Sequence, residues 1–177
     1  FNVQKAPFDD VRVRKAFALA IDKEDIVNKI RKSGIPAGAF VAPGLPDAKE
    51  GEDFREVGGD FFPLKAQPEE ARKLLAEAGY PDGQGFPEVT LIYNTDEGHK
   101  KIAEAALEMW KQNLGISNIK LSNQEWAVFV NTRQNGDFQI ARHGWIGDYT
   151  HPMTFIDLFT TGNGNNDAQW SNKEFDE

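Results

Sequence analysis

Residues 141–149 read ARHGWIGDY and concentrate charged, aromatic and glycine residues in one short stretch. The two glycines would weaken a strand, and burying an unpaired Arg142 or Asp148 is costly. We therefore expect a strand that ends in a ligand-facing turn. An arginine suits a carboxylate through two parallel hydrogen bonds, and an aspartate can pair with an ammonium group. The alternatives are a sheet-edge ion pair for Arg142 and a hydrogen bond within the local turn for Asp148.

Two aromatic residues of the same stretch, Trp145 and Tyr149, could form apolar walls for a ligand side chain. Trp145 could instead belong to the core. Trp110 and Trp126 fit core positions by helical periodicity, however, whereas Trp145 does not. We therefore expect Trp145 and Tyr149 to line a pocket.

Two further basic residues lie on other predicted elements. Arg133 lies near the end of a predicted helix, where the helix dipole favours any basic residue, so a structural role fits it as well as a ligand role. His99 falls in the first turn of another predicted helix, among unpaired N–H groups that favour an anion. A surface histidine without a role is the alternative, because neighbouring acids can satisfy the same helix end.

A metal site or an enzyme active site is a different interpretation of residues 141–152. His143, Asp148 and His151 are residue types that bind zinc. Their spacing matches no established ligand pattern, and glycine and proline residues interrupt any regular face that could hold the ligands. The sequence also has no G-x-S-x-G, H-E-x-x-H or phosphate-loop motif. We expect no metal and no catalytic residue, with a metal-dependent hydrolase using His143 or His151 as the alternative.

The composition excludes several other classes of protein. The 177 residues, of which 40% are hydrophobic, can bury one core, so we expect a single domain over residues 1–177. A formal net charge of -8 is unfavourable for binding nucleic acid. There is no cysteine, and no apolar run approaches the length of a membrane span. The sequence starts without a methionine or a signal peptide, so we expect a piece of a larger protein.

Hydrophobic periodicity and capping signals predict alternating helices and strands. Helices are expected over residues 11–22, 22–32, 67–80, 96–115 and 125–135, with Asp22, Pro68 and Thr95 at helix starts and Gly79 and Gly115 at helix ends. Strands are expected over residues 88–93, 116–124 and 137–145. Residues 35–65 show no sustained period and should form a long surface excursion. This alternation predicts an α/β fold with helices packed on a mixed sheet.

Several segments resemble a known family. Residues 7–22 read PFDDVRVRKAFALAID. They resemble the signature helix of the peptide- and nickel-type substrate-binding proteins of ABC importers. Three further segments resemble the oligopeptide-binding branch of that family. They are residues 91–101, LIYNTDEGHKK, residues 124–149, QEWAVFVNTRQNGDFQIARHGWIGDY, and residues 155–176, FIDLFTTGNGNNDAQWSNKEFD. The resemblance covers the chain from end to end except for residues 35–65. The strand over residues 116–124 looks one residue longer than the family pattern.

The resemblance implies a fold and a set of ligand-binding residues. It implies the second, peptide-binding lobe of a two-lobed protein with a type II periplasmic-binding-protein fold, in which the peptide lies extended between the lobes. The aspartate that holds the peptide's ammonium group falls within W-x-x-D-Y, at Asp148. The residues that meet the peptide's carboxylate at different peptide lengths fall on Arg142, Arg133 and His99.

The function that this resemblance implies is the substrate-binding component of an ABC transporter. Such a protein would capture oligopeptides by charge pairing at their termini and by backbone hydrogen bonds, and would deliver them to a membrane permease. We expect it to work outside the cytoplasm as a monomer, without a cofactor. A dipeptide, nickel, haem or an oligosaccharide is the alternative ligand within the family. Charged anchors at Asp148 and Arg142 favour a zwitterion over a sugar or a metal.

Overall fold

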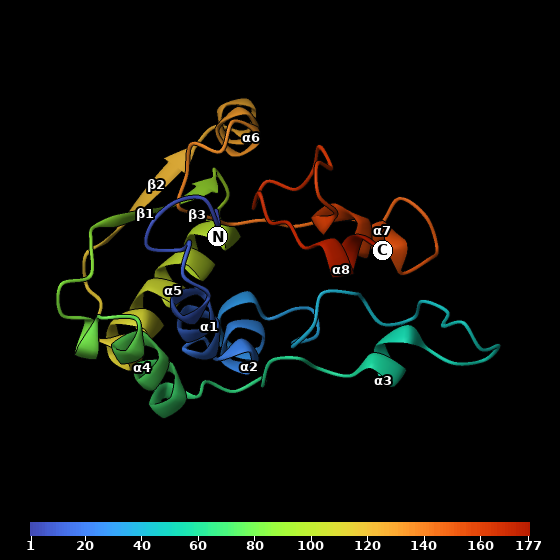
Figure 1. The fold of residues 1–177 in the computed structure, drawn as a ribbon, viewed down its shortest axis with the longest axis horizontal. Helices are drawn as coiled ribbons and strands as arrows, with labels where there is room; N and C mark the ends of the chain where they lie inside the picture. The colour runs from blue at the N-terminus through green and yellow to red at the C-terminus, as the bar shows by residue number, and fades with distance from the viewer.

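Three parallel strands form the sheet of the computed structural model, which describes residues 1–177 (Figure 1). The strands are ordered β2-β1-β3 and are β1 (Val89–Asn94), β2 (Ile119–Gln124) and β3 (Ile140–Ala141). The central strand β1 pairs with β2 along its whole length and is almost entirely buried. The predicted α/β class is confirmed. These strands pair only in parallel, where a mixed sheet was expected, and β3 is much shorter than the strand predicted over residues 137–145.

Helices connect the strands and cover the sheet. The longest helices are α1 (Val11–Leu19), α4 (Pro68–Glu77), α5 (Glu97–Leu114) and α6 (Trp126–Gln134). α5 connects β1 to β2, and α6 connects β2 to β3. Figure 1 shows α1, α4 and α5 grouped below the sheet, with α6 beyond its opposite side. The sheet is therefore a layer between a three-helix group and a single helix.

The core is divided by the sheet, because successive side chains of a strand point to opposite faces. Leu91 and Tyr93 belong to a main core of 17 buried residues that also includes residues of α1, α4 and α5. Ile92 points the other way and packs with Phe129 of α6 and with Phe138. The large core holds the helices on β1, and the small cluster holds α6.

The helix boundaries follow the predicted signals at most ends. Pro68 is the first residue of α4, and Gly79 follows the helix with a φ of 99°. Gly115 ends α5 with a φ of 75°, and a Cβ at this position would lie 2.4 Å from the Asp82 carbonyl oxygen. Only glycine satisfies both the conformation and the close approach at that helix end.

The predicted tryptophan positions divide into one that is correct and one that is wrong. Trp110 is buried, and its indole N–H donates to the Phe17 carbonyl at 3.0 Å. Trp126 is 56% exposed, although its periodicity indicated a core residue. The reason is that α6 contacts the sheet through Phe129, its only fully buried residue, whereas Trp126 and Val128 face outward.

The second predicted helix is only partly α-helical. It begins as α2 (Lys23–Asp25), where the Asp22 side chain accepts a hydrogen bond from the Asp25 N–H at 2.8 Å, and continues as a π-helix, η1 (Ile26–Arg31). It ends at Lys32, which has a φ of 57° and is the last residue of the predicted range. A π-helix has more residues per turn than an α-helix, so the last residues of η1 point in a different direction from the predicted helix face.

Two segments lie outside the main core. The first is the excursion, residues 35–65, whose one regular element is the short helix α3 (Phe54–Gly58), as expected for a surface excursion. The second is the C-terminal segment, residues 142–177, with α7 (Met153–Ile156), η3 (Asp157–Phe159) and α8 (Lys173–Asp176). Figure 1 shows both segments extending to the same side of the molecule. A further short turn, η2 (Pro81–Gly83), precedes β1. None of the helices combines the length and the hydropathy that a membrane span requires.

Candidate functional site

The carboxyl ends of the parallel strands meet at one edge of the sheet. β1 ends at Asn94 and β2 ends at Gln124, and these two residues lie opposite each other in register. The side-chain oxygens Asn94 Oδ1 and Gln124 Oε1 are buried there without a hydrogen-bond partner. Ligands of open α/β sheets bind in the crevice outside this edge. This edge is therefore the centre of the candidate site.

His99 lies at this edge in the first turn of α5. Asp96 caps the helix, with Oδ1 accepting a hydrogen bond from the His99 N–H at 2.9 Å. The predicted cap, Thr95, was wrong because its hydroxyl is bonded to Asn123 Oδ1 of β2 at 2.6 Å. His99 Nδ1 is buried without a hydrogen-bond partner. Burial, and then the charge of Arg142, lower the pKa of His99 below its ordinary value.

Arg142 follows β3 directly. Its N–H donates to the Ile92 carbonyl at 2.9 Å and extends the strand pairing by one bond. Its guanidinium lies over Gly144, where an added Cβ would be 3.2 Å from Nη2. Burial, and then the charge of Arg31, lower the pKa of Arg142, and Asp96 is the one acid that opposes this shift. The guanidinium is half-buried and has no ion-pair partner within the chain.

Arg31 is a third basic residue at this edge, and sequence reasoning missed it. It ends the π-helix η1, and its charge lowers the pKa of both His99 and Arg142. In the sequence it is one of several basic residues that complement the helix dipole. No sequence signal marks the π-helical turn that directs it toward Arg142. We call Arg31, His99 and Arg142 the basic centre.

Arg133 is also close to Arg142, but the chain itself supplies a partner for it. Its Nη1 lies 2.9 Å from Oδ2 of Asp167 in the C-terminal segment, and its guanidinium lies 4.9 Å from the centre of the Phe129 ring. The N–H groups of Nη1 do not point at this carboxylate oxygen, so the contact is an ion pair without a hydrogen bond. The Nε of Arg133 has no hydrogen-bond partner either. The Arg133 side chain is 11% exposed. Arg133 is therefore a nearly buried cation whose charge is already compensated.

A cavity of about 170 Å³ lies beside this ion pair. Apolar residues form most of its wall, and four polar side chains complete it. The lining includes Phe40, Phe138, Leu158, Phe159, Arg133, His143, Asn165 and Asp167. His143 Nε2 is 3.9 Å from Asp167 Oδ2. Burial, and then the charges of Arg133 and Arg142, lower the pKa of His143 to about 4. Burial raises the pKa of Asp167, although Arg133 opposes the shift.

Asp148, Trp145 and Tyr149 lie on the C-terminal segment. The Asp148 N–H donates to Thr154 Oγ1 at 2.8 Å and fixes the turn, while the Asp148 carboxylate is exposed and free of hydrogen bonds within the chain. The Tyr149 hydroxyl is exposed and lies 3.5 Å from the Asp157 carboxylate. Local desolvation by neighbouring groups, and then the charge of Asp157, raise the pKa of Tyr149. Trp145 is partly buried, and its indole N–H is buried without an acceptor.

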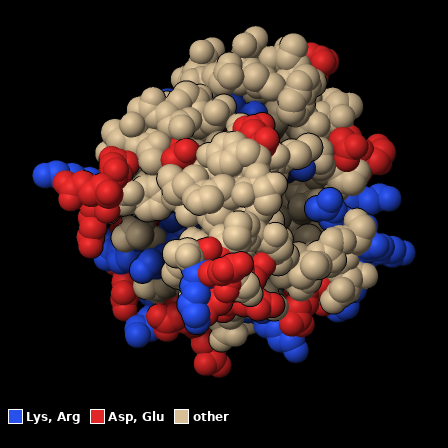
Figure 2. Space-filling view, turned by 90° about the vertical axis from the view of Figure 1, so that its right-hand side faces the viewer, with Lys and Arg blue, Asp and Glu red and all other residues tan.

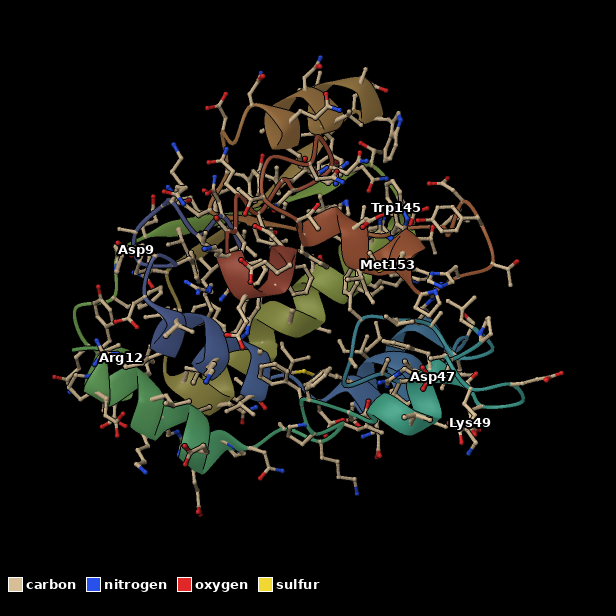
Figure 3. All side chains as sticks on the ribbon, turned by 45° about the vertical axis from the view of Figure 1, so that its right-hand side comes forward. Asp9, Arg12, Asp47, Lys49, Trp145 and Met153 are labelled. Atoms are coloured by element: carbon tan, nitrogen blue, oxygen red, sulfur yellow. The ribbon has the colours of Figure 1, made fainter.

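The predicted site residues therefore fall into two groups. Arg142 and His99, joined by Arg31, form the basic centre at the sheet edge, with Arg133 close behind. Asp148, Trp145 and Tyr149 lie on the C-terminal segment; Figure 3 shows Trp145 near Met153, above the excursion that carries Asp47 and Lys49. Asp148 does not contribute to the pKa shifts of Arg142 or His99. A cationic group and a separate free carboxylate are what two oppositely charged ends of one ligand require.

The two histidines of the C-terminal segment, His143 and His151, do not lie together as the ligands of a metal site would. His151 Nδ1 accepts a hydrogen bond from the Met153 N–H at 3.2 Å, which stabilises the start of α7. His143 faces the cavity beside Asp167. No three His, Asp or Glu side chains come close enough together to hold a metal ion. The cluster of His143, Asp148 and His151 considered from the sequence is not assembled.

The comparison with known proteins begins with a family model described as bacterial extracellular solute-binding proteins, family 5 middle, which matches residues 1–167. The chain belongs to this family. The resemblance found in the sequence is thereby confirmed, and the family is one of solute-binding proteins. The family 5 match includes the sheet, the basic centre and Asp148.

Individual relatives of this family 5 chain carry peptide-binding names. The periplasmic oligopeptide-binding protein OppA of Salmonella typhimurium is 43% identical over 99% of this chain and 31% of its own length. The dipeptide-binding protein DppE of Bacillus subtilis is 41% identical over 100% of this chain and 32% of its own length. A crystal structure of a periplasmic oligopeptide-binding protein from Borrelia burgdorferi, OppAIV, has a TM-score of 0.82 at 37% identity, covering 99% of this chain and 33% of that one. The chain thus spans about a third of the length of these relatives.

Proposed function

We propose that this chain forms part of the substrate-binding protein of an ABC importer and holds the two charged ends of an oligopeptide. The observation that carries the proposal is the half-buried guanidinium of Arg142, which has no acid partner and has two other cations near it. Such a group is stabilised by an anion, and a carboxylate matches its planar geometry. The names of the relatives indicate that the anion belongs to a peptide.

The basic centre would bind the peptide's carboxylate, and Asp148 would bind its ammonium group. His99 contributes an imidazole at the first turn of α5, where a negative charge is favoured by the unpaired N–H groups of the helix. Arg31 adds positive charge from η1. Trp145 and Tyr149, on the same segment as Asp148, would contact a ligand side chain. Backbone hydrogen bonds along the peptide would be indifferent to its sequence.

Arg133 has a conditional role in this proposal. A peptide carboxylate can use Arg133 only by competing with Asp167, whose carboxylate is 2.9 Å away. The raised pKa of Asp167 indicates that this carboxylate is held at an energetic cost in its buried position. Arg133 should therefore contribute to peptides whose length brings their carboxylate to it, and contribute little to others.

We also infer the context in which the chain works. Residues 1–177 form one lobe of a two-lobed protein, and the ligand is enclosed between that lobe and the remainder. The protein binds its ligand without chemical conversion, acts outside the cytoplasm as a monomer and delivers the ligand to a membrane permease. The descriptions of the family as extracellular and of the relatives as periplasmic support this location.

The test is isothermal titration calorimetry on the full-length protein with peptides that have either a free or an amidated C-terminus. Arg142→Ala should weaken binding of free-acid peptides by roughly two to three decades, because it removes a partner of a desolvated charge. Amidated peptides should bind the wild type weakly and lose little more in the variant, which is the coupling expected for direct contact. Arg12→Ala, at an exposed ion pair on α1, is the matched control and should leave affinity unchanged. Equal affinity of the wild type for both kinds of peptide would refute the proposal.

A dipeptide is the second candidate ligand, because the dipeptide-binding relative is nearly as similar as the oligopeptide-binding one. The same calorimetry with alanine peptides of increasing length separates the two. Affinity confined to the dipeptide would identify a short ligand, and affinity for longer peptides would support an oligopeptide.

A further inference from the structure

A second concave surface lies away from the basic centre, between the excursion and the C-terminal segment. It is an apolar groove with a volume of about 300 Å³, and eight of its eleven lining residues are hydrophobic. The aromatic residues that line it are Phe40, Phe54, Phe61, Phe159 and Phe175. Figure 2 shows this side of the molecule, where uncharged side chains form a broad area over the centre and charged side chains gather below it and at its sides.

The backbone of the excursion keeps one wall of this groove exposed to solvent. The Phe61 side chain is 82% exposed. Its backbone is held by hydrogen bonds, because the Gly38 carbonyl accepts from the N–H groups of Phe61 at 3.1 Å and Phe62 at 2.9 Å, and the Gly38 N–H donates to Asp60 Oδ1 at 2.8 Å. A Cβ at Gly38 would lie 1.9 Å from the Phe62 carbonyl oxygen, so this arrangement requires glycine. An ordered loop thus presents Phe61 to solvent.

The two walls of the groove are poorly buried within the chain. The main core of 17 residues includes no residue of the excursion or of the C-terminal segment. Val41 is the one buried apolar side chain of the excursion, and the only buried apolar side chains of the C-terminal segment are those of Pro152 and Leu158. The walls meet mainly through Phe40, whose ring centre is 4.6 Å from that of Phe159. Ordered aromatic surface of this kind is unusual on a protein face that stays in water.

The chemistry of the groove favours a permanent apolar partner over a charged or transient one. Arg55 is the only ionisable residue in its lining, and its guanidinium is already bound to Asp60 and, at 2.5 Å, to the Gly59 carbonyl. No free charge is left there to attract a peptide terminus. Surfaces that are apolar throughout are typical of obligate interfaces, whereas transient interfaces are more polar.

The relatives indicate where such a partner comes from. The chain spans about a third of their length, so about two-thirds of the polypeptide of such a protein lies outside the matched region. We propose that the groove is the packing face on which an apolar part of that remaining polypeptide docks, with Phe61 of the excursion and Phe175 of α8 covered by it.

Thiol labelling in the full-length protein tests this docking directly, because the 177 residues contain no cysteine. Phe61→Cys is labelled with a maleimide, and the modified peptide is quantified by mass spectrometry. Lys49→Cys is the reference, since Lys49 lies in the same excursion and its side chain is 78% exposed. The thiol at position 61 should react roughly ten- to a hundred-fold more slowly than that at position 49, the factor that corresponds to full burial of a phenylalanine side chain. The two rates should become equal in urea.

Equal rates for positions 61 and 49 in the native full-length protein would overturn the proposal. Protection that appears only with saturating peptide would make the groove a ligand site, and protection that disappears on dilution would make it a contact between two copies; both results contradict docking within one polypeptide. Phe175→Cys, on the opposite wall, should be protected as well. Hydroxyl-radical footprinting of the unmodified full-length protein, in which oxidation of Phe61 should be low, covers the case that the cysteine variants fold poorly.

Discussion

Lowering the pH from about 7.5 to about 5 should destabilise the folded chain through His143, and His143→Gln should remove that loss. The pKa of His143 is lowered to about 4 in the folded chain by burial and by Arg133, against an ordinary value of 6.5. Between these two values the unfolded chain binds a proton that the folded chain does not. Because folding lowers the pKa of His143, its neutral form contributes stability above the pKa of the unfolded chain. That contribution is lost as the pH falls through 6.5 toward 4.

The magnitude follows from the two pKa values. Their difference of about 2.5 corresponds to roughly 3.4 kcal/mol when the full effect is reached, and to about 2 kcal/mol at pH 5. The His143 side chain is 32% exposed, and solvent screening therefore reduces the expected loss at pH 5 to about 1–2 kcal/mol.

The assay is urea unfolding followed by tryptophan fluorescence, for the wild type and for His143→Gln at both pH values. The wild type should lose about 1–2 kcal/mol more than the variant on acidification. Asp167 and Arg133 are present in both proteins, so their own contributions largely cancel in this difference. A proton NMR titration of the His143 ring gives a direct check. Equal losses in the two proteins, or a ring that titrates near 6.5, would refute the burial argument.

Three other outcomes are expected. Asp167→Asn should destabilise the chain by about 3 kcal/mol in urea unfolding, because Arg133 stays nearly buried without a counter-charge, and adding Arg133→Met should restore part of the loss. Gly38→Ala should cost about 2 kcal/mol or more through the clash at its Cβ, whereas Gly164→Ala, with open space around it, should change the unfolding midpoint little. In the full-length protein, calorimetry should show peptide affinity rising as the pH falls from about 8 to about 6, because a bound carboxylate raises the pKa of His99 and binding takes up a proton. His99→Gln should abolish this slope, and a slope that persists in the variant would remove His99 from the site.

Local signals in the sequence predicted most of the helices because their causes are local. Asp22 caps its helix, Pro68 opens α4 and Gly115 ends α5, each for a reason that depends only on nearby backbone groups. The long excursion was also predictable, since a stretch without hydrophobic period cannot bury a face.

The errors arose where tertiary contacts decide the outcome. Thr95 lost the cap to Asp96 because β2 engages its hydroxyl. Trp126 is exposed because α6 packs through Phe129 alone. β3 ends at Ala141, before the glycines that follow it, because only one further hydrogen bond joins it to β1.

The candidate site was predictable only in part. Motif matching selected Arg142 and His99, and the structure brings Arg142 close enough to His99 for its charge to lower the pKa of the imidazole. The contributions of Arg31 and Asp167 were not predicted, because one depends on a π-helical turn and the other on a contact between residues that are distant in the sequence. Periodicity does not contain information of either kind.

The position of Phe40 links the shapes of two spaces. This one ring lines both the cavity beside Arg133 and the apolar groove, and its centre is 4.6 Å from that of Phe159, which lines both spaces as well. Any substitution of Phe40 therefore changes the walls of the cavity and of the groove together. A variant meant to probe the groove alone has to leave Phe40 in place, as Phe61→Cys does, because Phe61 lines the groove and not the cavity.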